Sequence, residues 1–238
     1  LNLNMLKCFF EKKGKNEENL FTDLAIWQAG EEYRSRYGRF PVISLTFKDV
    51  KSSTWETCLK DFENQIRNLY ISFDYLLKEE GLNAIEKEQC KAIMSLKDEG
   101  DYKNSLALLS RCLYKVHKSK VIILIDEYDI PIQQGYVHSF YNQVVEFIKT
   151  FLSGGLKDNP HLELAVLTGI LRVSKESIFS DLNNPEVCTL LSHQYADKFG
   201  LLENEVIRML EYYGIGYELD HVRVWYNGYI CGNTEIYD

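Results

Sequence analysis

The sequence has no hydrophobic run long enough to cross a membrane. Its longest uninterrupted aliphatic run is the five residues from Val121 to Ile125, whereas a membrane-spanning helix needs roughly 20 apolar residues. The first residues also lack the basic-then-apolar layout of a secretory signal. We therefore predict a cytoplasmic protein with no membrane partner.

Cysteine pairs, clustered histidines and excess positive charge are missing as well. The six cysteines include no C-x-x-C pair, and the five histidines are scattered along the chain. The sequence therefore predicts reduced thiols and no structural zinc site. A net charge of −8 repels a phosphate backbone, so a nucleic-acid partner is not indicated.

A phosphate-binding G-x-x-x-x-G-K-[ST] segment is also absent. The pair Gly14-Lys15 is followed by Asn16, and Phe9 stands where the motif requires its first glycine. The backbone amides of such a loop hold the phosphates of a nucleotide. We therefore predict that these 238 residues alone bind and hydrolyse little or no nucleotide.

Helices and strands alternate along the chain. Continuous apolar runs predict strands over residues 40–47, 120–125 and 162–168. Apolar residues at steps of three and four predict helices over 4–10, 20–37, 53–77, 83–96, 101–117, 137–152 and 204–213, with the sixth ended by Gly154-Gly155. Strands separated by helices require crossover connections, so the predicted fold is α/β with a mostly parallel sheet flanked by helices.

The strand over 120–125 runs into the acids Asp126, Glu127 and Asp129. Ligands of such sheets bind beyond the carboxyl ends of the strands. Carboxylates at the edge of a core lose hydration there, and this loss costs free energy unless a cation or a hydrogen-bond donor compensates it. In P-loop nucleotide hydrolases, the first acid holds Mg²⁺ and a following glutamate activates the attacking water. Asp126 and Glu127 are therefore candidate catalytic residues, with Asp126 and Asp129 as candidate Mg²⁺-site residues.

These acids also admit structural interpretations. Asp126 could cap the next helix, Glu127 could pair with an arginine or a lysine, and Asp129 could be a turn residue before Pro131.

The strand over 162–168 ends in a second group of polar residues. Thr168 is a candidate for sensing a terminal phosphate, while Arg172 and Lys175 are candidates for stabilising the charge of phosphoryl transfer. Asn183 is a candidate nucleotide contact. Alternatively, Thr168 satisfies backbone groups, Arg172 bridges to a surface acid, and Asn183 caps a helix.

Ordered motifs extend this pattern over the whole chain, most strongly over 121–238. They are Leu124–Asp129 with Pro131, Leu167–Ser180, Leu182–Asn184, Phe199-Gly200 with Glu205-Val206, Trp225–Tyr229, and Ile236-Tyr237. In this order they resemble the bacterial AAA-ATPase-like proteins, which often carry a PD-(D/E)XK nuclease-like domain further on. Two positions depart from that pattern: Asp181 replaces the more frequent glycine and Asn227 the usual aspartate.

The resemblance implies a P-loop NTPase-like fold that binds ATP and Mg²⁺ in its full-length form. It makes Asp126 and Glu127 the Mg²⁺ and water-activating acids, and Thr168 and Arg172 a sensor-like pair. Leu1 to Phe10 resembles the helix that follows the family's phosphate loop, so the chain is expected to begin after that loop and to stop before the nuclease-like part. It implies an α/β core over 1–200, lacking the first strand and the loop, and the start of a helical lid over 201–238.

Two other functions stay open from the sequence. One is a regulatory or interaction module that uses the same scaffold without chemistry, with an unknown protein partner. The other is a metal-dependent nuclease that uses Asp126, Glu127 and Asp129, although no Glu-x-Lys follows on a second strand: the nearest candidate, Glu163-Leu-Ala165, lacks the lysine.

Overall fold

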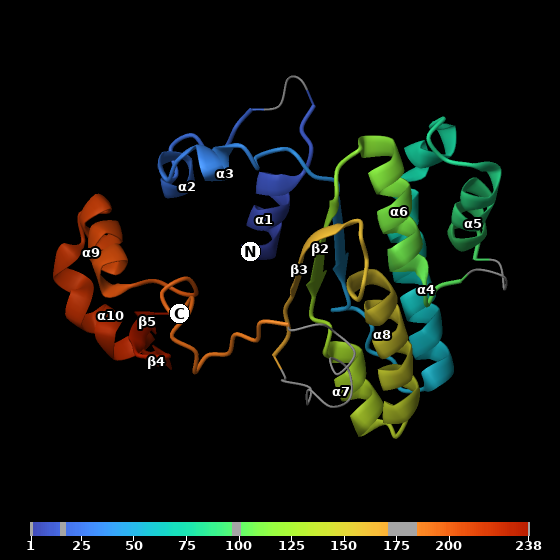
Figure 1. Ribbon diagram of the computed structural model, residues 1–238. Coiled ribbons are helices and arrows are strands. Elements are labelled where there is room, and N and C mark those ends of the chain that lie inside the picture. Colours follow the sequence, from blue (N-terminus) through green and yellow to red (C-terminus); the bar gives the residue numbers. More distant parts are fainter. Residues whose placement is uncertain (1, 15–17, 97–100, 171–184, 238) are drawn as a thin grey trace. The chain divides into compact units, whose positions relative to one another are not determined.

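The structure is a computed structural model that describes residues 2–14, 18–96, 101–170 and 185–237. The chain divides into two compact units, residues 1–183 and 184–238. This division precedes the predicted boundary at 200/201, and the assignment of the two segments as an ATPase core and a lid stays a prediction. Figure 1 labels the elements of both units.

The first unit is built on a three-stranded parallel sheet. Its strands are β1 (Val42–Thr46), β2 (Val121–Asp126) and β3 (Leu162–Leu167), in the spatial order β1-β2-β3. Thr46 pairs with Asp126, and Ile125 pairs with Leu167, so the strands end at the same edge. The predicted α/β class with a parallel sheet is confirmed.

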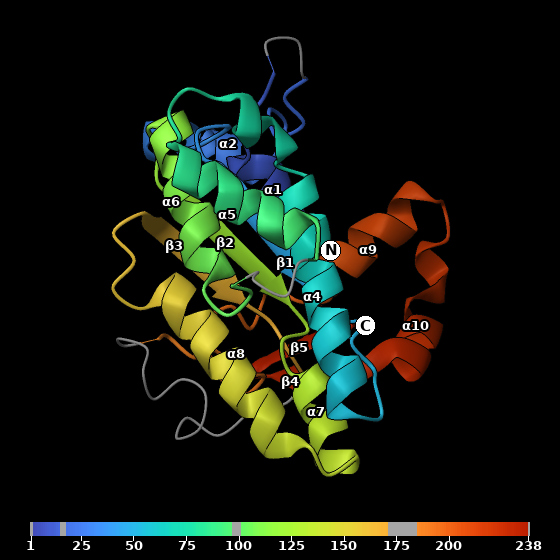
Figure 2. The same cartoon turned by 90° about the vertical axis from the view of Figure 1, so that its right-hand side faces the viewer.

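One face of the sheet is covered by three long helices. They are α4 (Trp55–Ile71), α6 (Ser105–His117) and α8 (Tyr141–Leu156), and Figure 2 shows them in front of the sheet. Ile123 and Ile125 of β2 are fully buried in this core. Burial of such side chains contributes about 1.5–3 kcal/mol each, which explains why an unbroken aliphatic strand lies at the centre.

The other face of the sheet is covered by α1 (Asn2–Phe10), which Figure 1 shows on the side opposite α6 and α8. Ile122 and Leu124 of β2 pack there against Leu3 and Leu6 of this helix. Because side chains alternate along a strand, even-numbered positions of β2 face α1 and odd-numbered positions face the other helices. Asp126 therefore belongs to the α1 face.

Two of the helices begin with side-chain caps. Thr54 caps α4 through its side-chain oxygen, which accepts the Thr57 backbone N–H at 3.3 Å. After α4 come the short 3-10 helix η1 (Asp74–Lys78) and α5 (Ala84–Met94), which begins with a reciprocal capping box between Asn83 and Glu86. Such boxes satisfy two otherwise unpaired N–H groups.

Other predicted boundaries were wrong. The segment predicted as one helix over 20–37 contains only the single-turn helices α2 (Ala25–Gln28) and α3 (Glu31–Arg34). An unpredicted helix, α7 (Ile130–Val137), follows β2, with Pro131 in its first turn, where proline is tolerated. Helix α8 continues through Gly154 and Gly155 instead of ending before them.

The second unit combines helices with an antiparallel hairpin. It contains α9 (Glu203–Tyr212), η2 (Gly216–Glu218), α10 (Leu219–Tyr226), β4 (Asn227–Cys231) and β5 (Thr234–Tyr237). Arg223 of α10 bonds Glu203 of α9 at 2.6 Å, and the Tyr237 hydroxyl donates to the same carboxylate at 2.7 Å. The predicted helix over 204–213 is confirmed, but the unit is not purely helical.

Glu86 is a buried acid that ties α5 to α6. Its side chain is 5% exposed, and its Oε1 lies 2.6 Å from Nζ of Lys115 and 3.2 Å from Nε of Arg111. Burial alone would raise the pKa of Glu86, but the Lys115 and Asn83 hydrogen bonds and the two cations hold that pKa below its ordinary value of 4.5. The ionised carboxylate therefore stabilises the folded chain.

We expect Glu86→Gln to lower the free energy of unfolding by about 1–3 kcal/mol at pH 7. Because the folded pKa is depressed, this contribution is present above about pH 4.5 and is lost as the pH falls through the folded pKa. Urea unfolding at pH 7 and pH 3 measures it, with the exposed neighbour Glu88→Gln as the control. An equal loss at both pH values would contradict the assignment.

Candidate functional site

The three parallel strands bring polar side chains together where they end. Thr46 is in register with Asp126, and Thr168 follows Leu167, the partner of Ile125. The backbone pairing continues past β3, because Thr168 N–H donates to Ile125 O at 2.9 Å. The carboxyl edge of the sheet thus carries a hydroxyl, a carboxylate and a second hydroxyl on adjacent strands.

Asp126 and Thr168 are in direct contact. The Thr168 hydroxyl donates a hydrogen bond to Oδ1 of Asp126, and both residues lie on partly buried positions. The residue at the N-cap of α7 is Asp129, not Asp126, so the interpretation of Asp126 as a helix cap is wrong. The hydroxyl holds one carboxylate oxygen, and a carboxylate has a second oxygen that can accept a further donor or bind a cation.

Glu127 occupies the turn at the exit of β2. Its φ is +52°, a left-handed conformation that costs a non-glycine residue roughly 1–2 kcal/mol. Its carbonyl accepts the Ile130 N–H at 3.2 Å, which closes the turn. Over the described ranges, its half-buried carboxylate has no arginine or lysine partner. Glu127 follows Asp126 directly, but because it lies in this turn, its side chain does not follow the alternation of side chains along β2.

Asp129 connects the segments that follow β2 and β3. It is fully buried, and its Oδ2 accepts the Ile170 backbone N–H and the Gln133 side-chain N–H, each at 3.0 Å. Charge-assisted bonds of this kind are stronger than neutral ones. Asp129 thus positions the two loops at the strand ends, and its predicted part in holding Mg²⁺ stays a prediction.

Two residues of this site were missed by the sequence-based prediction. A Cβ at Gly169 would lie 2.5 Å from Oδ1 of Asp129, so only glycine permits this approach. The Thr-Gly pair after a buried strand was the available signal. Thr46 was missed because a threonine at a strand end is common, and only the register places it beside Asp126.

The donors at this edge are oxygen atoms, which Mg²⁺ prefers. It is usually bound by one or two carboxylates, waters and substrate phosphates, and the carboxylate of Asp126 beside the Thr168 hydroxyl fits this pattern. No group of three or more His, Cys, Asp or Glu side chains suited to a metal occurs within the described ranges. Asp126, Glu127 and Asp129 therefore do not form the three-acid cluster that the nuclease alternative requires.

Three predicted site residues lie outside the described residues. They are Arg172, Lys175 and Asn183.

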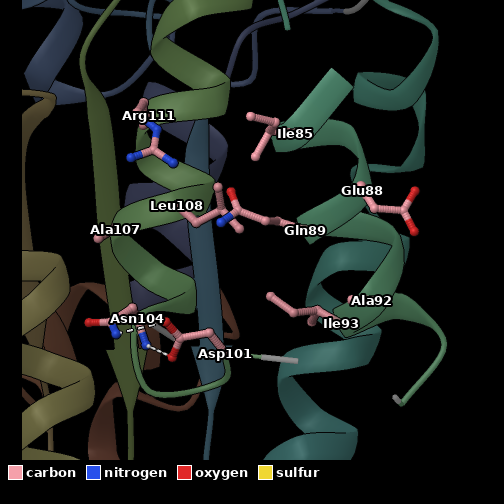
Figure 3. Close-up of a pocket in the computed structure, with 10 residues that line it drawn as sticks. All are labelled: Ile85, Glu88, Gln89, Ala92, Ile93, Asp101, Asn104, Ala107, Leu108 and Arg111. Carbon is pink, nitrogen blue, oxygen red and sulfur yellow. Dashed lines mark hydrogen bonds between the residues drawn. The ribbon is translucent and has the colours of Figure 1, made fainter. Parts of the chain in front are cut away.

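A cavity of about 540 Å³ lies elsewhere in the first unit, between α5 and α6. Figure 3 shows the side chains of the two helices across it, with Asp101 hydrogen-bonded to Asn104 at one end. Asp126, Glu127 and Thr168 are not among its lining residues. The strand-end site and this cavity are therefore separate features.

The first unit is an α/β domain with acid and hydroxyl groups at the carboxyl edge of a parallel sheet, where such folds bind their ligands. The family model described as "Predicted AAA-ATPase" matches residues 1–179. The chain belongs to this AAA-ATPase-like family, which confirms the resemblance seen in its motifs. The family supports nucleotide binding and an ATPase-like domain.

A curated relative is described as an uncharacterized protein in the vnfD 5′ region of Azotobacter chroococcum mcd 1. It is 29% identical over 120 residues, which cover 50% of this chain and 23% of that protein. The chain thus spans less than a quarter of that relative's length. No solved structure matches the chain. No helix in the described part is both long and apolar enough to cross a membrane.

Proposed function

We propose that this chain supplies the Mg²⁺-binding and water-activating side of an ATP-hydrolysing site. The observation that carries the proposal is the hydrogen bond from Thr168 to Asp126 at adjacent strand ends, with Glu127 on the next turn. Family membership supports the nucleotide. The PD-(D/E)XK nuclease-like domain and the lid remain parts of this proposal that rest on the resemblance.

In this proposal each residue has a defined task. The second carboxylate oxygen of Asp126 would hold the Mg²⁺ or its bound water, while the Thr168 hydroxyl keeps the carboxylate oriented. Bound Mg²⁺ would neutralise charge on the phosphates. Glu127 orients the attacking water and accepts its proton at a carboxylate oxygen, and its turn places it beyond the strand end.

Binding of the phosphates requires a phosphate-binding loop, and the 238 residues contain no G-x-x-x-x-G-K-[ST] segment. The proposal therefore places that loop in a longer protein that includes this chain. β3 is the last strand in the order β1-β2-β3 among the described residues and pairs with β2 on one side. A further parallel strand that leads into the loop would pair with this edge.

The experiment is ATP hydrolysis by the longer protein at several Mg²⁺ concentrations. We expect Asp126→Asn to lower turnover at limiting Mg²⁺ by at least about tenfold, because the amide is a poorer ligand for a hard cation. Asp49→Asn, at an exposed acid just beyond β1, is the matched control. An unchanged Mg²⁺ dependence in Asp126→Asn would exclude this role, and no ATP hydrolysis by the longer protein would exclude the function.

A further inference from the structure

An apolar surface of the second unit lies where α10 leads directly into β4 (Figure 1). Val224 and Trp225 are each 80% exposed, Tyr229 is 60% exposed and Ile230 is 69% exposed. Together with the exposed Tyr226 they form what we call the α10–β4 surface. Large apolar side chains that lie together on a surface mark interaction sites, and aromatic residues are enriched in protein–protein interfaces.

The backbone of β4 also presents an open edge. Among the residues that the structure describes, β4 pairs only with β5. On the other side of β5, Tyr237 exchanges two backbone hydrogen bonds with Leu201, each 2.9 Å long. Alternate residues of a strand direct their backbone groups to the same side, so Glu235 also directs its groups away from β4. The N–H and C=O of its partner Ile230 therefore face away from β5.

Nothing in the sequence of β4 protects this edge. Proteins often block an exposed strand edge with lysine or proline, and β4 reads Asn-Gly-Tyr-Ile-Cys. A register shift between Asn227 and Tyr229 limits the regular part of the strand to residues 229–231. The edge thus offers one outward N–H and C=O pair, at Ile230, next to exposed aromatic side chains.

The charge of the second unit indicates which partner fits this edge. Residues 185–237 contain eight Asp or Glu and three Lys or Arg. Two of the three cations are already paired, Lys198 with Asp197 and Arg223 with Glu203, each at 2.6 Å. The excess of acids attracts a basic segment and repels a second copy of the same unit.

We propose that the α10–β4 surface binds a basic, extended segment of another protein, which adds to the outer edge of β4 as a strand. The segment donates an N–H to the Ile230 carbonyl and accepts the Ile230 N–H. In strand addition, main-chain bonds supply affinity and alternate side chains supply specificity. Apolar side chains of the segment cover Ile230 and Trp225, and its basic side chains are attracted by the acids of the unit. This interaction is independent of the proposed ATPase function.

The test titrates the 238-residue chain into a fluorescein-labelled heptapeptide of alternating lysine and valine at low salt, followed by fluorescence anisotropy. We expect saturable binding that weakens at least about tenfold when every peptide residue is N-methylated, because the peptide then has no N–H for the Ile230 carbonyl. Replacing the lysines by glutamates should abolish binding. Equal affinity of the N-methylated peptide would overturn strand addition.

Hydrogen exchange of the Ile230 amide gives a readout that charge attraction alone does not produce. A saturating concentration of the lysine–valine peptide should slow this exchange at least about tenfold, because the amide becomes bonded. Unchanged exchange at Ile230 in the saturated complex would contradict the proposal, and this measurement needs no variant.

Variants locate the contact. Ile230→Pro removes the outward N–H and should weaken peptide binding at least about tenfold, while proline is tolerated on an edge strand where the N–H faces solvent. Trp225→Ala should also weaken binding. Tyr136→Ala, at a 79% exposed position of α7, is the matched control and should bind as the wild type does. Wild-type affinity of both Ile230→Pro and Trp225→Ala would place the peptide elsewhere.

Two further measurements address other occupants of the surface. Sedimentation velocity of the chain without peptide should show a monomer, and a dimer that Ile230→Pro dissociates would assign the surface to a second copy. Phosphatidylcholine vesicles should not bind the chain, and vesicle binding that Trp225→Ala abolishes would assign the surface to lipid. Either result would overturn the proposal.

Discussion

Glu127→Gln in the longer protein is expected to lower ATP turnover by about 100-fold or more, because glutamine cannot accept the proton of the attacking water. ATP binding should be retained, since the two side chains have nearly the same size and Asp126 with Thr168 is untouched. A single-turnover assay together with a nucleotide-binding measurement separates the two effects.

Glu163→Gln is the matched control for this experiment. Glu163 lies at the start of β3, at the opposite end of the sheet from Glu127, and its Oε1 is 3.5 Å from a nitrogen of Arg36 at the surface. Exposed pairs of this kind contribute little, so turnover should stay at the wild-type level. Full turnover by Glu127→Gln would show that another group activates the water.

Gly169→Ala is expected to destabilise the chain by about 1–3 kcal/mol, as overpacking of a filled site does. The new Cβ would lie 2.5 Å from Oδ1 and 2.9 Å from Cγ of Asp129, and 3.0 Å from Cε1 of Tyr128. Asp129 is fully buried and holds the Ile170 N–H, so it cannot move without breaking that bond. In the longer protein, ATP turnover should fall as well, because both strand-end loops shift.

Denaturant unfolding of the chain measures the Gly169→Ala effect directly. Gly216→Ala is the control, because a Cβ added at Gly216 would have Glu211 Cγ as its nearest neighbour, at 3.9 Å, which is an ordinary van der Waals distance. The control should keep the free energy of unfolding within about 0.5 kcal/mol of the wild-type value. Equal midpoints for Gly169→Ala and the control would show that the Gly169–Asp129 approach is dispensable.

Local sequence patterns predicted the strands of the parallel sheet, including the central strand β2, which is buried on both faces. The runs over 120–125 and 162–168 correspond to β2 (Val121–Asp126) and β3 (Leu162–Leu167). A continuous run of β-branched and aliphatic residues favours a strand inside a parallel sheet, and this preference depends on the local residue order alone. For the same reason, the acids that follow β2 could be identified as site candidates before the fold was known.

The segment over 20–37 shows where periodicity was insufficient. Its aromatic residues pack on α1 instead of forming one helix: Phe21 lies 5.1 Å from Phe9, and Tyr37 lies 5.7 Å from Phe9, between ring centroids. Such contacts between distant segments outweigh helix propensity, which is a weak preference for each residue. The prediction of a helix there had no access to them.

Helix α8 shows the same limit for glycine. Gly155 ended the predicted helix, yet the helix continues through it because α6 crosses closely: an added Cβ would lie 2.6 Å from Cβ of Leu106. Glycine is therefore used here for contact with a neighbouring helix, which no local pattern reveals.

The sequence by itself determined the alternation of helices and strands, the central strand and the acids at its end, because each depends on local residue order. Tertiary structure alone decided that Thr168 holds Asp126 and that Gly169 makes room for Asp129. These contacts join residues far apart in the chain. They depend on strand register and helix packing, which a sequence pattern does not specify.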